Sequence, residues 1–279
     1  MDQTMIDEYL TTLECADCRE ISCENLFALQ AAHLRKIPYS NLTILIGGEP
    51  DLSVEALFDR LISRKQGGYC FELNGLLGQL LRDLGYEVTE YFGRWHFGLP
   101  DEVAPQRHRI SVVTCGGAKF IVDAGVASPA PVVPLKFVFD EEQYSSWRCY
   151  RLRWDPVYGN VVETLADGVW KAFYSFGDTP AFARDFEYVN YFCSTHASSV
   201  FRKKFFAARQ DDTQHISIEN PTENEPFFQF VIRTAAGRKS IPVETSETMR
   251  QILHDEFGMT GLPETLPGQL AFYLKQGVL

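Results

Sequence analysis

The sequence lacks several features that would each point to a particular class of protein. No apolar run reaches the length of about 20 residues that a membrane-spanning helix needs. The acidic first residues, 1–8, have neither the basic region nor the apolar core of a secretory signal peptide. Basic residues are scarce, since 26 Lys and Arg face 37 Asp and Glu for a net charge of −11. A surface of this sign disfavours nucleic acid and anionic membranes, so we expect neither as a partner.

Cysteines are too few and too scattered to form a disulfide framework. The chain has seven, an odd number spread over 279 residues, which favours a reducing, cytoplasmic location. Cys15 and Cys18 have C-x-x-C spacing, with Cys23 five residues further on. A structural zinc site would need a second pair at similar spacing, and the chain has none. We therefore interpret these three as surface or part-buried cysteines and expect no bound metal.

The patterns that are present divide the chain into three regions without a low-complexity linker between them. Residues 1–85 have helical periodicity, with Ser22 and Ser53 placed to cap two helices, and predict a small helical bundle. Residues 86–190 have strand-like runs with a period of two, which predict an antiparallel barrel or sandwich. Residues 191–279 mix helix and strand. We predict an α+β protein of three abutting subdomains with these boundaries.

A cysteine stands directly before the most regular helical pattern of the chain. After Gly67-Gly68-Tyr69-Cys70 come leucines at helical spacing, namely Leu73, Leu76, Leu77, Leu80, Leu81 and Leu84. They predict a helix that begins at or near Cys70 and ends at Gly85. The start of a helix favours an anion, which for cysteine is the reactive thiolate. The alternative is that Cys70 is a small buried hydrophobic residue, the usual role of a free cysteine.

A predicted hairpin supplies a possible base and an acid. If Gly116-Gly117 is the centre of an even-length turn, Ile110 faces Asp123 and His108 lies diagonal to Asp123, about 7–8 Å away along the sheet. A slip of one residue would put the two side chains on opposite faces. Taken alone, a histidine at a strand end and an aspartate in a turn are structural residues. Together with Cys70, however, they form a Cys-His-Asp set, in which the base activates the thiol and the acid orients the base.

Two other histidines, His96 and His196, are weaker candidates for the base. No acidic residue is placed opposite either one by an equally simple argument.

These motifs resemble the arylamine N-acetyltransferase family over nearly the whole chain. The matching segments are Gly67-Gly68-Tyr69-Cys70 with Asn74, His108 before the hairpin, Val122-Asp123-Ala124-Gly125, Ile37-Pro38-Tyr39 with Asn41-Leu42, and Asp185-Phe186, Asn190, Ser194-Thr195 and Ser199-Val200-Phe201. The resemblance implies a helical bundle, an antiparallel β-barrel and an α/β lid around a cysteine-protease-like Cys-His-Asp core.

The resemblance also implies a ping-pong reaction. Acetyl-CoA, as a substrate and not as a bound cofactor, would acetylate Cys70, with His108 as base and Asp123 as the carboxylate that orients it. An arylamine, hydrazine or N-hydroxyarylamine would then take the acetyl group. We expect a monomer or a homodimer. The same triad also serves amide synthases, thiol proteases and transglutaminases, and a member with weakened catalysis would only bind a small aromatic molecule or a partner.

The chain departs from the family pattern at two places. An Arg before the two glycines is Gln66 here, and a Glu between an aromatic residue and Asn is Ser40, so we expect these two to share a hydrogen bond. The loop after the aspartate, typically Gly-Phe-Gly, is Gly125-Val126-Ala127-Ser128-Pro129. That loop borders the family's acyl and acceptor pocket, which makes Val126 a candidate substrate contact. Ser198, in a segment resembling the family's CoA-contacting region, is a second candidate.

Overall fold

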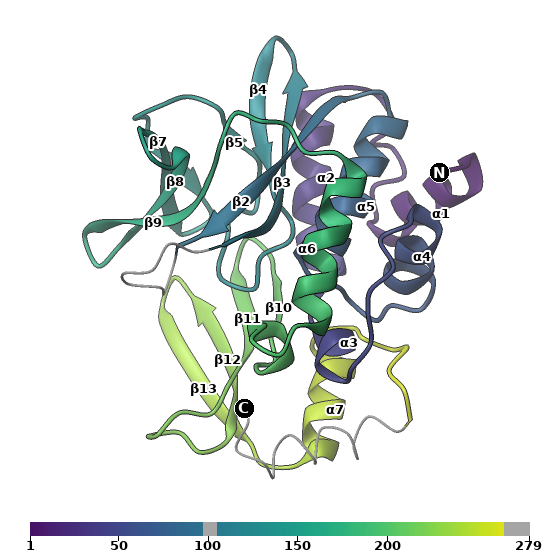
Figure 1. The fold of residues 1–279 in the computed structure, drawn as a ribbon, viewed down its shortest axis with the longest axis vertical. Helices are drawn as coiled ribbons and strands as arrows, with labels where there is room; N and C mark the ends of the chain where they lie inside the picture. Colours follow the sequence, from purple (N-terminus) through teal and green to yellow (C-terminus); the bar gives the residue numbers. More distant parts are fainter. Residues whose placement is uncertain (97–104, 265–279) are drawn as a thin grey trace.

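The computed structural model describes residues 1–96 and 105–264, and its first 85 residues are mainly helical (Figure 1). The helices here are α1 (Gln3–Thr12), α2 (Cys23–Lys36), α3 (Leu42–Leu45), α4 (Val54–Phe58) with a π-helical turn (Asp59–Ser63), and α5 (Cys70–Asp83). The Ser22 hydroxyl accepts a hydrogen bond from the N–H of Asn25, so the predicted cap of α2 is confirmed. Helix α1 was not predicted. No helix in the described ranges is long and apolar enough to cross a membrane.

Helix α5 begins at the predicted residue and is largely buried. Cys70 is its first residue, and Gly85, with φ of +95°, ends it in the left-handed conformation that favours glycine. The predicted leucine stripe is almost entirely buried. Full burial of a leucine side chain is worth roughly 1.5–3 kcal/mol, so this stripe anchors the helix strongly. Around it pack α2, α4, α6 (Ala183–Thr195) and two strands of the large sheet.

The large sheet has eight antiparallel strands in the order β5-β4-β3-β2-β9-β8-β7-β6. They are β2 (Glu87–Trp95), β3 (Gln106–Cys115), β4 (Ala118–Val122), β5 (Leu135–Lys136), β6 (Gln143–Ser145), β7 (Arg148–Asp155), β8 (Gly159–Ala166) and β9 (Val169–Phe176). The side chain of Gln143 joins the two edge strands, since it accepts from the N–H of Lys136 (2.7 Å) and donates to its carbonyl (2.9 Å). The sheet is therefore a nearly closed barrel.

The smaller sheet has the order β1-β10-β11-β12-β13 and draws on both ends of the described chain. It is formed by β1 (Tyr39–Ser40), β10 (Ala207–Gln210), β11 (Gln214–Glu219), β12 (Phe228–Thr234) and β13 (Gly237–Val243), and α7 (Ser246–Asp255) follows. Strand β1 pairs with β10, so the helical region contributes to this sheet. The predicted boundary at residue 190 falls inside α6, and the three subdomain ranges stay predictions.

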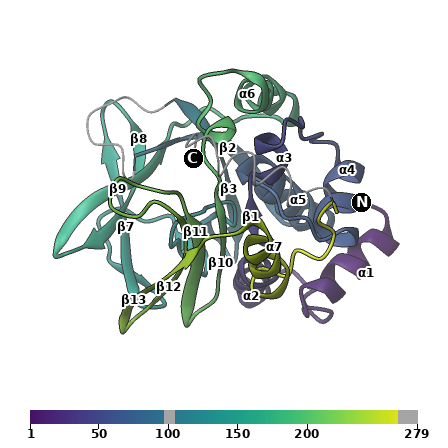
Figure 2. The ribbon, with the colours of Figure 1, turned by 90° about the horizontal axis from the view of Figure 1, so that it is seen from below.

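The views agree on how these parts are arranged. Figures 1 and 2 show the barrel strands β7, β8 and β9 on one side and helices α1, α4 and α5 on the other. Strands β2 and β3 lie between them, and both contact α5. The barrel strand that carries His108 is thus packed directly against the helix that carries Cys70.

A buried ion-pair network joins β3 to α5 and β2. The Nε of Arg109 donates to Glu90 Oε1 (2.7 Å), and its Nη1 donates to the carbonyl of Phe71 (3.2 Å). Arg82 pairs with the other oxygen of Glu90 at 2.8 Å. A Cβ at Gly75 would lie 2.5 Å from Arg109 Nη1, so only glycine leaves room for the guanidinium. The network fixes the neighbour of His108 against the start of α5.

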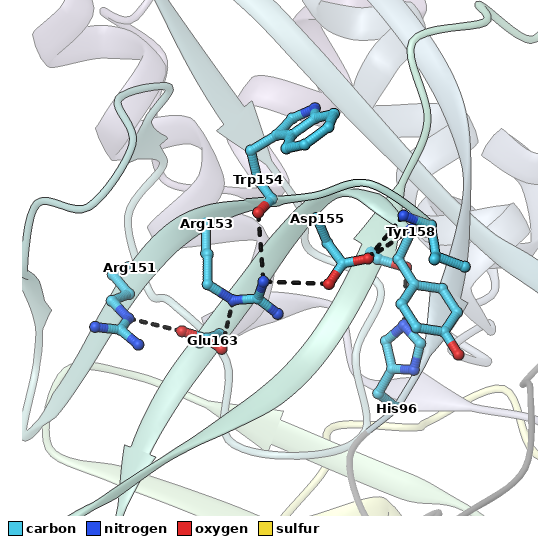
Figure 3. Close-up of polar contacts among 9 residues, drawn as sticks. His96, Arg151, Arg153, Trp154, Asp155, Tyr158 and Glu163 are labelled. Atoms are coloured by element: carbon cyan, nitrogen blue, oxygen red, sulfur yellow. Dashed lines mark hydrogen bonds and ion pairs between the residues drawn. The ribbon is translucent and has the colours of Figure 1, made fainter.

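The outer wall of the barrel carries a second, more exposed polar cluster (Figure 3). Glu163 on β8 accepts from Arg151 (2.6 Å) and Arg153 (3.1 Å) on β7, and Arg153 also reaches Asp155 (3.2 Å). Such partly exposed pairs contribute little to stability because water competes for both charges.

The buried network gives a stability prediction. We expect Glu90→Ala to lower the free energy of unfolding by roughly 3–5 kcal/mol, because it leaves two guanidinium groups without their shared carboxylate. Urea unfolding followed by circular dichroism measures this. The control is Lys171→Ala, which breaks an exposed contact with Asp167 (3.6 Å) and should leave the midpoint unchanged within error. Equal midpoints for the two variants would contradict the assignment of the network as a stabilising contact.

Candidate active site

The β3–β4 hairpin has the register that the sequence predicted. Ser111 pairs with Val122, which makes the turn at Gly116-Gly117 even in length. His108 and Asp123 therefore share a face, and the ring Nε2 of His108 donates to Asp123 Oδ2 at 2.6 Å. Both side chains are buried. A short bond to a carboxylate in a water-poor site is a strong one, and it holds the imidazole in one orientation.

The Asp123 carboxylate is itself held by groups from the helical region. Its Oδ1 accepts from Asn74 Nδ2 (2.7 Å) and from the backbone N–H of Gly125 (3.0 Å). Asn74 Oδ1 accepts in turn from the N–H of Ala124 (2.8 Å), and the N–H of Asp123 donates to Gln30 Oε1 on α2 (3.1 Å). The carboxylate is thus held by three hydrogen bonds, and residues of α2, α5 and the hairpin meet at Asp123.

The nucleophile candidate lies on the same face of α5 as Asn74. The two residues are four apart in the helix, and such residues are neighbours on its surface. The Sγ of Cys70 is 3.6 Å from the carbonyl of Arg107, the residue before His108. A Cβ at Gly125 would lie 2.8 Å from the Cα of Cys70, so the loop after Asp123 passes directly over the cysteine. The structure therefore brings Cys70, His108 and Asp123 to one place.

Burial works against ionisation of this thiol. Cys70 is only 3% exposed, and burial, followed by the nearby Cys193 and Asp123, raises the pKa of its thiol well above the usual value. Hydrogen bonds with the backbone of Arg109 on β3 and of Phe71 in α5 lower the pKa of the thiol, but by less. A thiolate at neutral pH thus needs a proton acceptor at hand. His108 is suited to this role because Nε2 is taken by Asp123, which leaves Nδ1 for the thiol proton.

Cys70 and His108 open onto a cavity of about 680 Å³. Its walls come from all three regions and combine apolar rings with cationic groups; among them are Tyr39, Trp95, Phe201 and Phe206, and Arg107, Arg148, Lys204 and Arg233. The volume lies in the range of small-molecule sites. An aromatic substrate with polar or anionic substituents fits the chemistry of this lining.

The two candidate substrate contacts have different positions. Val126 is buried and lines the cavity, next to Gly125. Ser198 lies on an exposed turn after α6, where its hydroxyl bonds to His196 Nδ1 (2.8 Å), and it is not among the residues lining the cavity. Whether either one contacts a substrate stays a prediction.

The predicted hydrogen bond between Gln66 and Ser40 is wrong. Gln66 Nε2 donates instead to the carbonyl of Gly261 (2.7 Å), and Ser40 Oγ accepts from the N–H of Leu42 (3.2 Å). The pattern could not reveal this, because Gly261 is 195 residues away in the sequence.

The other candidate histidines lie outside the cavity lining. His96 bonds to Ser175 Oγ (2.8 Å) and meets the ring of Tyr158 in the outer cluster of the barrel (Figure 3). His196 stacks on Phe192, with ring centroids 4.5 Å apart. Within residues 1–96 and 105–264, no three His, Cys, Asp or Glu side chains converge as metal ligands would.

Sequence reasoning missed two kinds of residue at this site. The first is Asn74, which belongs to a sequence motif but was not predicted to hydrogen-bond Asp123. Its position four residues after Cys70, on the same helix face, was the available signal. The second kind comprises Arg148 and His215, which reach the cavity from β7 and β11 and had no local signal.

The fold and the site place a buried thiol, a held imidazole and a carboxylate beside a cavity of small-molecule size. A family model described as N-acetyltransferase matches residues 22–262. The chain is 30% identical to the arylamine N-acetyltransferase of Mycobacterium tuberculosis (strain H37Rv), over 83% of this chain and 81% of the relative. It is 27% identical to that of Escherichia coli (strain K12), over 91% and 89%.

Solved structures agree with the sequence relatives. Mycobacterium marinum arylamine N-acetyltransferase matches with a TM-score of 0.87 and 29% identity, over 98% of this chain and 100% of that one. Its structure in complex with CoA also gives 0.87, over 97% and 98%. The chain belongs to the arylamine N-acetyltransferase family and is an acetyltransferase. The predicted fold class is confirmed.

The role of Asn74 in holding the Asp123 carboxylate can be tested without a substrate. We expect Asn74→Ala to lower the free energy of unfolding by roughly 2–4 kcal/mol, because it strips buried partners from Asp123, Ala124 and Arg109. Chemical denaturation measures the loss. Asn25→Ala is the matched control, since Asn25 makes one exposed side-chain bond, to Glu20. A loss for Asn74→Ala no larger than for the control would contradict this account of the site.

Proposed function

We propose that this protein transfers an acetyl group from acetyl-CoA to an arylamine, hydrazine or N-hydroxyarylamine by a ping-pong mechanism through Cys70. The observation that carries the proposal is the single site formed by Cys70 at the start of α5 and the His108–Asp123 pair opposite it. The held imidazole beside the Cys70 thiol supports a nucleophilic role for this residue over a role in packing alone.

In the first half-reaction His108 takes the thiol proton, and the Cys70 sulfur attacks the acetyl carbonyl. The C–S bond to the donor breaks, and the departing CoA thiolate receives the proton. This leaves an acetyl thioester on Cys70, while Asp123 stabilises the transient imidazolium.

In the second half-reaction the acceptor amine attacks the thioester carbonyl. His108 accepts the proton that the nitrogen loses, the C–S bond breaks, and the Cys70 sulfur takes the proton back. The products are the amide and the free thiol, so atoms and charge balance over the cycle. One thioester exchange and one aminolysis of a thioester thus replace a single direct transfer.

Donor and acceptor classes have separate support. The M. marinum relative is described in complex with CoA, and cationic side chains such as Arg107 and Lys204 in this cavity suit a phosphorylated donor. A Salmonella typhimurium relative, 34% identical over 53% of each chain, is named as both an N-acetyltransferase and an N-hydroxyarylamine O-acetyltransferase. The ring-lined walls of the cavity suit an aromatic acceptor.

Acetylation of the enzyme by the donor alone tests the ping-pong step. We expect acetyl-CoA without acceptor to add one acetyl group, found on the Cys70 peptide by mass spectrometry. Asp123→Asn should slow the step roughly 10²–10⁴-fold, because the imidazole loses its oriented partner. Cys18→Ser, outside the cavity, is the control and should be acetylated like the unaltered chain.

Two outcomes would overturn the proposal. One is transfer at an undiminished rate by Cys70→Ala. The other is turnover of a chromogenic peptide or an acyl-glutamine substrate in place of acetyl-CoA, which would point to a hydrolase or transglutaminase that uses the same triad.

Thiol reactivity against pH tests the role of His108. Because burial raises the pKa of the Cys70 thiol, the thiolate of a His108→Gln variant should form only at pH values above the usual cysteine range. We therefore expect iodoacetamide to alkylate Cys70 at pH 7 at least tenfold more slowly in this variant than in the unaltered chain, with the rate recovering as pH rises. Peptide mass spectrometry reports it, with the part-exposed Cys18 as an internal reference. Equal rates at pH 7 would refute the assignment of His108 as base.

A further inference from the structure

Two polar side chains in the cavity have buried atoms without hydrogen-bond partners. His215 on β11 is 1% exposed, and its Nδ1 has no partner among the described residues. Arg148, the first residue of β7, has a buried Nη1 that also has none among them. Both residues line the cavity that holds Cys70 and His108. A buried donor or acceptor left unpaired costs free energy, so two on one wall call for a ligand.

The protonation of His215 can be worked out from its other contact. Its Nε2 lies 3.1 Å from the carbonyl of Ala127, which can only accept, so Nε2 carries the proton. Burial, and then the positive charges of Arg233 and Arg148, lower the pKa of His215 to about 3. The ring is thus neutral at pH 7, and the buried Nδ1 keeps a lone pair that has no partner among the described residues. It can accept from an N–H or O–H group.

Arg148 differs from Arg233, which lines the same cavity, because it has no carboxylate partner within residues 1–96 and 105–264. Arg233 is paired with Glu219 and donates to Ser217 Oγ (3.2 Å). For Arg148 no carboxylate lies within ion-pair distance in the part of the chain that the structure describes. A guanidinium keeps its charge at every accessible pH. Arg148 is therefore an unneutralised cation with a buried N–H free for an anionic oxygen.

The distance from these groups to the nucleophile is limited by the loop between them. Gly125 packs on the Cα of Cys70, while the carbonyl of Ala127 bonds to His215. Two residues of extended chain span at most about 7 Å. The His215 ring is thus within the length of one small substituted ring from the loop segment that covers Cys70, and Arg148 lines the same cavity.

We propose that Arg148 and His215 form a subsite for an anionic group of the substrate. Arg148 donates to a carboxylate or phosphate oxygen, and His215 Nδ1 accepts from a neighbouring N–H or O–H of the same molecule. The inference rests on the proposed function, since the ligand is one of its two substrates. The anion comes either from a carboxylate on the aromatic acceptor or from a phosphate of the donor.

Equilibrium binding to the enzyme without transfer tests the subsite and separates the two sources. Isothermal titration calorimetry compares benzoate with benzamide, and CoA with pantetheine, which lacks the phosphates. We expect Arg148→Met to reduce the preference for the anionic member of one pair at least fivefold. A loss for benzoate identifies the acceptor carboxylate, and a loss for CoA identifies the donor phosphate.

The controls keep the test decisive. Arg151→Met, on the same strand but paired with Glu163, should change both preferences less than twofold. Arg148→Gln replaces Arg148→Met if the latter does not fold. A change below fivefold in both preferences would overturn the subsite. Binding does not depend on acetyl transfer, so a failure of the proposed function would appear separately, as an absence of acetylated Cys70.

Discussion

The contact on which the rest of the site depends is the one between His108 and the Asp123 carboxylate. One oxygen of Asp123 receives the ring N–H of His108, and the other is held by Asn74 and Gly125. The hydrogen bonds of this carboxylate connect the barrel hairpin to α5. The backbone N–H of Asp123 connects the hairpin to Gln30 on α2. The hydrogen bonds to this one residue fix the helical region and the barrel at one mutual position.

The position of Cys70 shows why this constraint is needed. The start of a helix favours a thiolate, but burial under the Gly125 loop outweighs that effect and raises the thiol pKa. In the proposed mechanism the held imidazole reverses this balance, because it accepts the thiol proton and leaves an ion pair. Arg109, next to His108, bonds to Glu90 on β2 and to the Phe71 carbonyl at the start of α5, so it holds the same strand in place. The interface between α5 and β3 therefore serves packing and, in the proposed mechanism, catalysis as well.

Much of this could be predicted because its causes are local in sequence. The leucine stripe located α5, and the even turn at Gly116-Gly117 was enough to place His108 beside Asp123. Strand β8 was not predicted, because it is buried at five successive positions and lacks the alternation of buried and exposed residues that reveals a strand. Gln66 found a partner in distant Gly261, and β1 joins a sheet made from the other end of the described chain. Contacts of this kind depend on the assembled fold and leave no periodic trace.

The central claim is that Asp123 sets the proton position and orientation of the His108 ring. Nuclear magnetic resonance of the chain with ¹⁵N-labelled histidine reports this directly, with His108 assigned from a His108→Gln variant. The account predicts a proton on Nε2 at neutral pH, with a strongly downfield signal that is lost or shifted upfield in Asp123→Asn. An unprotonated Nε2, or an Nε2–H signal unchanged in Asp123→Asn, would contradict it.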